Sequence, residues 1–198
     1  MGKQYEQLSP RYIEFIEQQK MFFVGTAAAT GKVNISPKGG DSLRVLGPSQ
    51  LVWLNATGSG NETSAHVQKL PRMTIMFCSF EGAPLILRAY GLVKVLHKTD
   101  PLWDSYIDLF PASISARQLY VLDIELVLSS CGTVVPLFDH VQDRTQMDAW
   151  VEKKGAQGIE DYWEAKNQLS LDGFETNILS LNGLSEEVPM AEEAPTAK

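Results

Sequence analysis

The distribution of apolar and polar positions indicates β-strands over much of the first 130 residues. Segments 85–96 and 120–130 alternate between two faces, which is the period of a strand with one buried side. In the second segment the even-numbered positions are apolar from Tyr120 to Leu128, whereas Asp123 and Glu125 interrupt the other face. Shorter β-rich segments complete a set of about six predicted strands, at 21–28, 33–36, 51–55 and 73–80.

Helix signals separate and follow these strands. Ser9 and Pro10 form a typical helix start, because serine caps free N–H groups and proline suits the first helical position. Asp100 and Pro101 repeat this pattern at the start of a predicted helix over 100–110. Two more helical regions are expected, a short helix over 64–70 and a pair of helices over 144–168 that separate near Gly155–Gly158.

The short connections between successive strands favour antiparallel pairing, since parallel neighbours need long crossovers. The expected fold is therefore mainly β with flanking helices, an antiparallel barrel of about six strands. Pro37 to Gly40 is expected to end the second strand. We expect a barrel domain over 1–140, a C-terminal helical extension over 141–182 and a disordered acidic tail over 183–198.

Charge and cysteine content narrow the class of protein. The 198 residues carry 17 Lys and Arg against 24 Asp and Glu, a net charge of −7, which argues against sequence-independent binding of nucleic acid. Cys78 and Cys131 cannot form a disulfide framework, and no apolar run is long enough for a membrane span or a signal peptide. We therefore expect a cytoplasmic protein without a membrane partner.

A polar loop rich in small residues, 57–63, precedes the predicted helix over 64–70. Free N–H groups at a helix start, together with the Thr63 and Ser64 hydroxyls, suit an anion such as a phosphate. The alternative is an ordinary capped helix in which Thr63 or Ser64 is the cap. A dinucleotide fingerprint is excluded, because the third glycine is missing and no parallel βαβ unit surrounds the loop.

Two cations stand in or beside predicted strands. Arg88 lies in an otherwise apolar strand, where it either faces solvent or binds an anion. Lys38 follows Ser36 and Pro37 near a strand end. The histidines and cysteines lack metal-ligand spacing, and no arrangement for nucleophilic catalysis is recognisable.

The order of these segments resembles the pyridoxamine 5'-phosphate oxidase-like family, whose members are flavin-binding split β-barrels. The resemblance covers roughly residues 10–135. It is carried by an ordered set of motifs: Asn34-Ile35-Ser36-Pro37-Lys38-Gly39, Trp53-Leu54-Asn55, Gly60-Asn61-Glu62-Thr63, Met73 to Phe77 and Leu87-Arg88-Ala89-Tyr90-Gly91. It implies a homodimer with FMN in the cleft between the subunits, and a small-molecule substrate.

The resemblance also implies which residues hold the cofactor. The flavin would lie along Ser36, Pro37 and Lys38 and be lined by Trp53, Leu54 and Asn55. The ribityl phosphate would lie near Asn61, Glu62 and Thr63, with the Ser64 hydroxyl and Arg88 as further phosphate contacts. Under this interpretation Lys38 stabilises negative charge on the reduced flavin.

Two departures from the family pattern change the expected substrate. Vitamin-forming oxidases carry an Arg-Lys pair where this chain has Glu62-Thr63, and they end with an Arg-x-His segment that this chain lacks. We therefore expect an FMN-dependent oxidoreductase that does not act on pyridoxamine phosphate. The alternative is a non-enzymatic flavin- or heme-binding protein for storage, sensing or stress response, with deazaflavin or heme as cofactor. His66 or His140 would then be the axial heme ligand. A weaker option is an empty cleft that serves only dimerisation.

Overall fold

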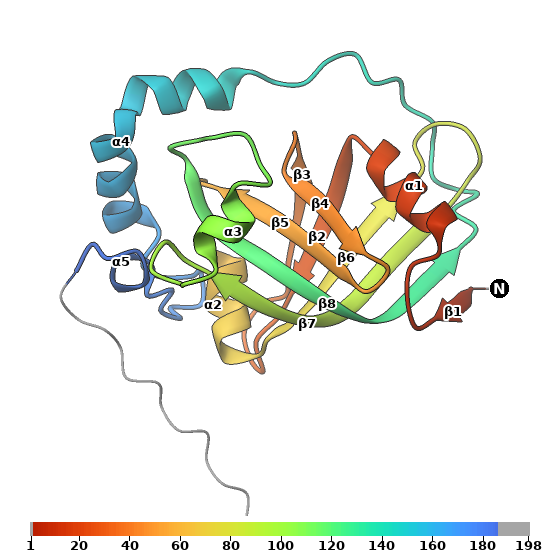
Figure 1. Cartoon of the computed structure of the whole chain (residues 1–198), viewed down its shortest axis with the longest axis horizontal. Coiled ribbons are helices and arrows are strands. Elements are labelled where there is room, and N and C mark those ends of the chain that lie inside the picture. The colour runs from red at the N-terminus through yellow and green to blue at the C-terminus, as the bar shows by residue number, and fades with distance from the viewer. Residues whose placement is uncertain (1, 186–198) are drawn as a thin grey trace, which may run out of the picture.

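The computed structural model describes residues 2–185 and shows one antiparallel sheet of eight strands (Figure 1). Its strands follow in the order β3-β2-β6-β7-β8-β5-β4, and β1 pairs with β8. The fold is thus the expected split barrel, with more strands than predicted. The strands are β1 (Lys3–Tyr5), β2 (Met21–Thr26), β3 (Asn34–Gly39), β4 (Leu43–Gly47), β5 (Gln50–Ala56), β6 (Arg72–Cys78), β7 (Ile86–Leu96) and β8 (Ala116–Ser130).

The two longest strands, β7 and β8, form the centre of the sheet. β8 begins at Ala116, four residues before the predicted start at Tyr120, and its first half pairs with β5 while its second half pairs with β1. A β-bulge at Gly91 interrupts the pairing of β7 with β8. Two short strands, β1 and β4, were not predicted, which accounts for the difference from about six strands.

The prediction that Pro37 ends the second strand is wrong. β3 continues through Pro37 and Lys38 to Gly39. The reason is that β3 lies at the edge of the sheet, where only one side of the strand needs its N–H groups for pairing. Residues of β3 consequently keep a regular alternation between the two faces of the sheet.

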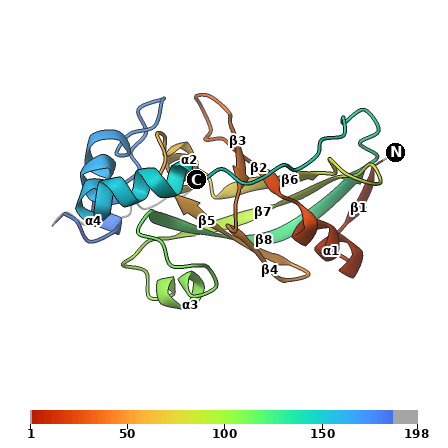
Figure 2. The same cartoon turned by 90° about the horizontal axis from the view of Figure 1, so that it is seen from above.

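The helices lie around the sheet rather than between its strands (Figures 1 and 2). They are α1 (Pro10–Gln18), α2 (Glu62–Lys69), α3 (Trp103–Ile107), α4 (Gln146–Lys166) and α5 (Ile178–Leu181). The predicted Ser9 cap is confirmed, since its side chain accepts a hydrogen bond from the Tyr12 N–H. α2 begins at Glu62, with Asn61 in the capping position, so neither Thr63 nor Ser64 is the cap. The predicted break in the C-terminal helix is confirmed at Gly155, where φ is 65°.

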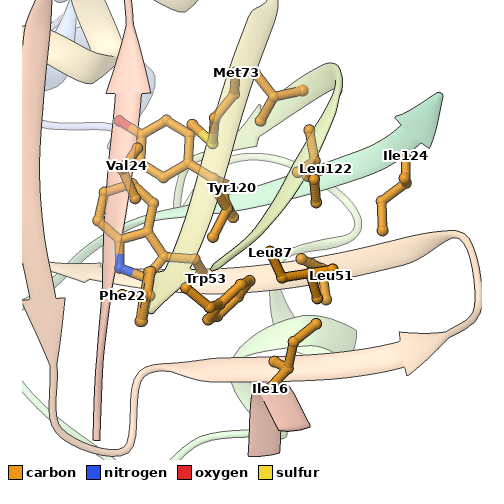
Figure 3. Packing of buried hydrophobic residues seen from close by; sticks show 14 of the residues in the cluster. Ile16, Phe22, Val24, Leu51, Trp53, Met73, Leu87, Tyr120, Leu122 and Ile124 are labelled. Atoms are coloured by element: carbon orange, nitrogen blue, oxygen red, sulfur yellow. The ribbon is translucent and has the colours of Figure 1, made fainter. Parts of the chain in front are cut away.

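Aromatic and branched side chains fill the concave side of the sheet (Figure 3). Trp53 of β5 and Tyr120 of β8 stack with ring centroids 4.8 Å apart, and Phe22 of β2 packs edge-on against Trp53. A second cluster on the opposite side of β5 and β8 packs beneath α3 and includes Leu54 and Trp103. Because apolar side chains are buried on both faces of β5 and β8, the orientation of these two strands is fixed.

The chain after β8 returns along the whole sheet to reach α4 at its far end (Figure 1). There Ile159, Trp163 and Ile178 form a separate apolar cluster. The Trp163 Nε1–H donates to Thr57 Oγ1 at 2.8 Å, which attaches α4 to the loop before α2. The acidic tail predicted over 183–198 lies outside the described residues from residue 186 onward. No helix among the described residues meets the length and apolarity that a bilayer crossing requires.

A side chain at Gly91 is expected to destabilise the fold. An added Cβ would lie 1.9 Å from the Asp123 carbonyl oxygen, because the bulge brings two backbones together. Gly91→Ala should lower the free energy of unfolding by roughly 2–4 kcal/mol in urea titration. Gly25→Ala, also in a strand but with its nearest neighbours at 3.9 Å, is the control. Equal effects of the two substitutions would contradict this explanation.

Acid is expected to destabilise the fold through His97, which is buried with Nε2 unpartnered. Burial lowers its pKa to about 4; nearby Asp100 opposes this shift and Arg117 adds to it. Between pH 6.5 and 4 the unfolded chain therefore binds the extra proton, and stability falls by on the order of 3 kcal/mol. His97→Gln should remove this part of the pH slope in chemical denaturation, whereas His140→Gln at an exposed position should not. Identical slopes for wild type and His97→Gln would contradict it.

Candidate functional site

A polar pocket of about 310 Å³ opens at the end of the barrel next to α2. It is formed by β3, the end of β5, the loop 57–61, the start of α2 and the first residues of β8. Six of the predicted site residues line it, namely Ser36, Lys38, Asn55, Asn61, Glu62 and Thr63, and they are joined by Asn34, Ala56, Gly58, Ser59, Gly60 and Arg117.

The alternation of β3 explains how its polar residues reach this pocket. In the pairing of β3 with β2, Asn34 and Ser36 stand opposite Thr26 and Val24, which face the interior. The Asn34 side-chain amide donates to Ser36 Oγ at 3.2 Å and to Thr63 Oγ1 at 3.3 Å. An edge strand and the first turn of α2 are thereby joined into one wall of the pocket.

Lys38 is the cation on the third inward position of β3. Its Nζ lies 5.0 Å from the centroid of the Trp53 ring, a cation–π distance. Burial lowers the pKa of Lys38 to about 8, and the positive charge of Arg117 adds to this effect. Lys38 is therefore mostly protonated at neutral pH, but it holds its proton less tightly than an exposed lysine does.

Arg117 is the second cation of the pocket and was not among the predicted site residues. On β8, Gln118 pairs with Asn55 and Ala116 with Ala56, so Arg117 is the extra residue of a β-bulge without a partner on β5. Its side chain is only 3% exposed, and burial lowers its pKa to about 10. Strict alternation along the strand would not have predicted this orientation, and no other signal in the sequence marks it.

Arg117 is surrounded by neutral hydrogen-bond partners. Its Nε donates to Gln118 Oε1 at 3.1 Å, and its Nη1 donates to Asn167 Oδ1 at 2.7 Å and to the Gly58 carbonyl at 3.4 Å. Among residues 2–185, neither Arg117 nor Lys38 forms an ion pair. The pocket therefore concentrates positive charge that no carboxylate neutralises directly.

Glu62 is the one acidic residue among those that line the pocket. Its carboxylate oxygens accept hydrogen bonds from the Leu171 N–H at 3.0 and 3.1 Å. Leu171 belongs to the described residues that follow α4, 167–185, which we call the C-terminal segment. The Glu62 carboxylate is therefore bonded to the C-terminal segment.

The other predicted site residues lie outside this pocket. Pro37 is exposed on the opposite face of β3, and Leu54 packs in the cluster beneath α3. Trp53 is buried in the main core, directly below Lys38. Ser64 is fully buried and accepts a hydrogen bond from the Gln68 side chain at 3.0 Å. Trp53 and Ser64 thus support the pocket from below.

Arg88 lines a different, mainly apolar pocket of about 590 Å³ on the outer face of the sheet. This pocket lies over β2, β3, β6 and β7, and Phe23, Ile35 and Met76 contribute to it. The Arg88 Nη1 donates to Ser130 Oγ at 3.3 Å. Within one chain, Arg88 and Thr63 therefore face separate pockets, so the two residues that the sequence suggested as joint phosphate contacts do not converge.

The two histidines considered as heme ligands occupy different environments. His66 is a buried residue of α2, with its Nδ1 3.2 Å from Thr26 Oγ1. His140 lines an apolar pocket together with Phe80 and Phe138, and its Nε2 lies 3.2 Å from Asp143 Oδ1. In the part of the chain that the structure describes, no group of His, Cys, Asp and Glu has the arrangement of a metal site.

The sequence profile of the family described as "Pyridoxamine 5'-phosphate oxidase" matches residues 8–131. The pyridoxamine 5'-phosphate oxidase family protein ustO of Aspergillus flavus is 38% identical over 144 residues, which are 70% of this chain and 58% of the relative. This chain thus spans less than two thirds of that relative's length.

Two solved structures are similar to the chain in fold. A single-residue variant of HupZ from Group A Streptococcus has a TM-score of 0.51 at 16% identity, covering 62% of this chain and 99% of its own. A Lactobacillus delbrueckii protein that carries the pyridoxamine 5'-phosphate oxidase name has a TM-score of 0.50 at 20% identity, covering 62% of this chain and 94% of its own. On the family match and on the identity to the Aspergillus protein, the chain belongs to the pyridoxamine 5'-phosphate oxidase family.

Proposed function

We propose that this chain binds FMN and acts as an oxidoreductase on a small organic substrate other than pyridoxamine phosphate. The observation that carries the proposal is the polar pocket, in which Lys38 and Arg117 lie beside the N-terminus of α2 without a neutralising carboxylate. A phosphate monoester has the charge and the acceptor oxygens that such a pocket lacks. Membership of the family supports a flavin as the group that carries this phosphate.

The residues of this chain divide the proposed work of binding between them. In this proposal Thr63 and Ser36 would supply hydroxyl groups and α2 free N–H groups for the phosphate, while Lys38, which lines the same pocket, would contact the flavin ring. When bound, FMN supplies the electron transfer, which explains why the sequence offers no nucleophile or acid–base pair. The ammonium of Lys38 would favour the reduced flavin, since reduction adds negative charge.

A homodimer with the cofactor at the subunit interface remains part of the proposal. The outer face of the sheet carries exposed apolar residues, including Val33, Ile35 and Leu92, next to the apolar pocket that Arg88 lines. Contiguous apolar surface of this kind is typical of a protein interface. Arg88 and Pro37, both outside the polar pocket, are then proposed cofactor contacts from this face rather than partners of Thr63.

The cytoplasm remains the proposed location. Cys78 is buried and Cys131 is exposed, and both are free thiols. Free thiols are typical of a reducing compartment. Neither cysteine is assigned a role in the proposed chemistry.

The visible spectrum of the purified full chain tests the proposed cofactor. We expect yellow flavin bands as purified or after addition of FMN, and FMN among the chromophores released by denaturation. As a comparison, heme is added to a separate sample of the protein from which any chromophore has been removed. A Soret band without any flavin binding would favour the storage or sensing alternative. Absence of flavin bands after addition of FMN would contradict the proposal.

Lys38→Met is expected to make bound FMN harder to reduce. Removing a cation beside the flavin should lower its midpoint potential by on the order of 30 mV, the equivalent of about 1.4 kcal/mol for a two-electron couple. Lys69→Met, at the exposed end of α2, is the matched control. The potential is measured by equilibration with a reference dye. If neither variant changes the midpoint potential, the proposed contact between Lys38 and the flavin is contradicted.

A further inference from the structure

The segment after α4 reaches the residues of the polar pocket through one side chain, the amide of Asn167, which does not line the pocket itself but bonds Arg117. Its Oδ1 accepts the 2.7 Å hydrogen bond from Arg117 Nη1, and its Nδ2 donates to the Gly58 carbonyl at 3.0 Å. Asn167 is fully buried. A single amide thus fixes the guanidinium against the loop that forms the rim of the pocket.

The choice of an amide matters for the charge of the pocket. A carboxylate at position 167 would form a buried ion pair with Arg117 and cancel its charge, whereas an amide orients the guanidinium and leaves the charge in place. The hydrogen bonds of Arg117 to described residues use Nε and Nη1. Its charge and its second terminal nitrogen are therefore available to a ligand.

Asn167 is itself held by several contacts. Its backbone carbonyl oxygen accepts hydrogen bonds from Thr176 Oγ1 at 2.5 Å and from Asn61 Nδ2 at 3.4 Å. The Gln68 side chain donates to the Thr176 carbonyl at 2.7 Å and so attaches the same segment to α2. The C-terminal segment is consequently docked on the loop 57–61 and on α2, the two elements that form the pocket beside Arg117.

From these contacts we propose that Arg117 is the principal anion-binding residue of the polar pocket, and that Asn167 is the positioning residue that directs it there. The C-terminal segment is then part of the binding site. The ligand class is a phosphate or phosphate monoester, and its identification with the phosphate of FMN rests on the proposed function. A buried guanidinium that lacks a carboxylate partner is costly, and an oxyanion in the pocket removes that cost.

Inorganic phosphate, titrated calorimetrically into the full chain, tests the inference without any flavin. Asn167→Asp should neutralise Arg117 and weaken phosphate binding by about tenfold or more, equivalent to about 1.4 kcal/mol. Arg117→Gln should weaken it to the same extent, and Arg117→Lys should restore part of it because the charge returns. Thermal melting of every variant separates loss of binding from loss of folding.

Asp172→Asn is the matched control within the same C-terminal segment. The Asp172 carboxylate accepts hydrogen bonds from the Lys32 backbone N–H and from Lys32 Nζ, both at 2.7 Å, and Asp172 does not line the pocket. We expect this variant to bind phosphate as the wild type does. Should Asn167→Asp fail to fold, the comparison of Arg117→Gln with Arg117→Lys carries the test.

Two outcomes distinguish this inference from the proposed function. If phosphate binding depends on Arg117 and Asn167 but FMN does not bind, the anion site stands and the flavin proposal fails. If FMN binds and folded Arg117→Gln and Asn167→Asp variants retain wild-type affinity for both FMN and phosphate, the inference is overturned and the flavin proposal survives.

Discussion

Uncompensated positive charge at one end of the barrel is the constraint on which the site depends. Arg117 is buried and Lys38 is half-buried; burial lowers the pKa of both, and the positive charge of Arg117 lowers the pKa of Lys38 further. The neighbouring groups orient these charges without cancelling them: an indole ring beneath Lys38, amides and carbonyls around Arg117, and Glu62 bonded to the Leu171 N–H. Buried positive charge without a partner is costly, and an anion bound in the pocket, as we propose, would remove that cost.

The fold provides this arrangement through an edge strand and a β-bulge. β3 lies at the edge, so it tolerates Pro37 and still directs Ser36 and Lys38 inward. The bulge at the start of β8 inserts Arg117 between two regular pairs and points its side chain into the pocket. Asn167 of the C-terminal segment then bonds both Arg117 and the Gly58 carbonyl. The residues that match the family, 8–131, cover the barrel, whereas Asn167 lies outside them.

The sequence was sufficient for features that depend on local patterns. Alternating segments predicted the long strands, Ser9 and Pro10 predicted the start of α1, and the glycines near 155 predicted the break in α4. It was insufficient where the environment decides: Pro37 breaks a central strand but not an edge strand, and Arg117 reaches the pocket only because of a bulge. Within one chain Arg88 and Thr63 line separate pockets, because Arg88 points to the outer face of the sheet, and alternation alone did not show which face of its strand is buried.

The affinity of the wild-type chain for FMN relative to riboflavin tests the central claim most directly, because the two ligands differ only in the phosphate. If the polar pocket holds that phosphate through Arg117 and its neighbours, FMN should bind at least ~100-fold more tightly, the equivalent of about one or two charge-assisted hydrogen bonds. The difference should shrink as salt is added. Equal dissociation constants for the two flavins, measured by fluorescence quenching, would contradict the account.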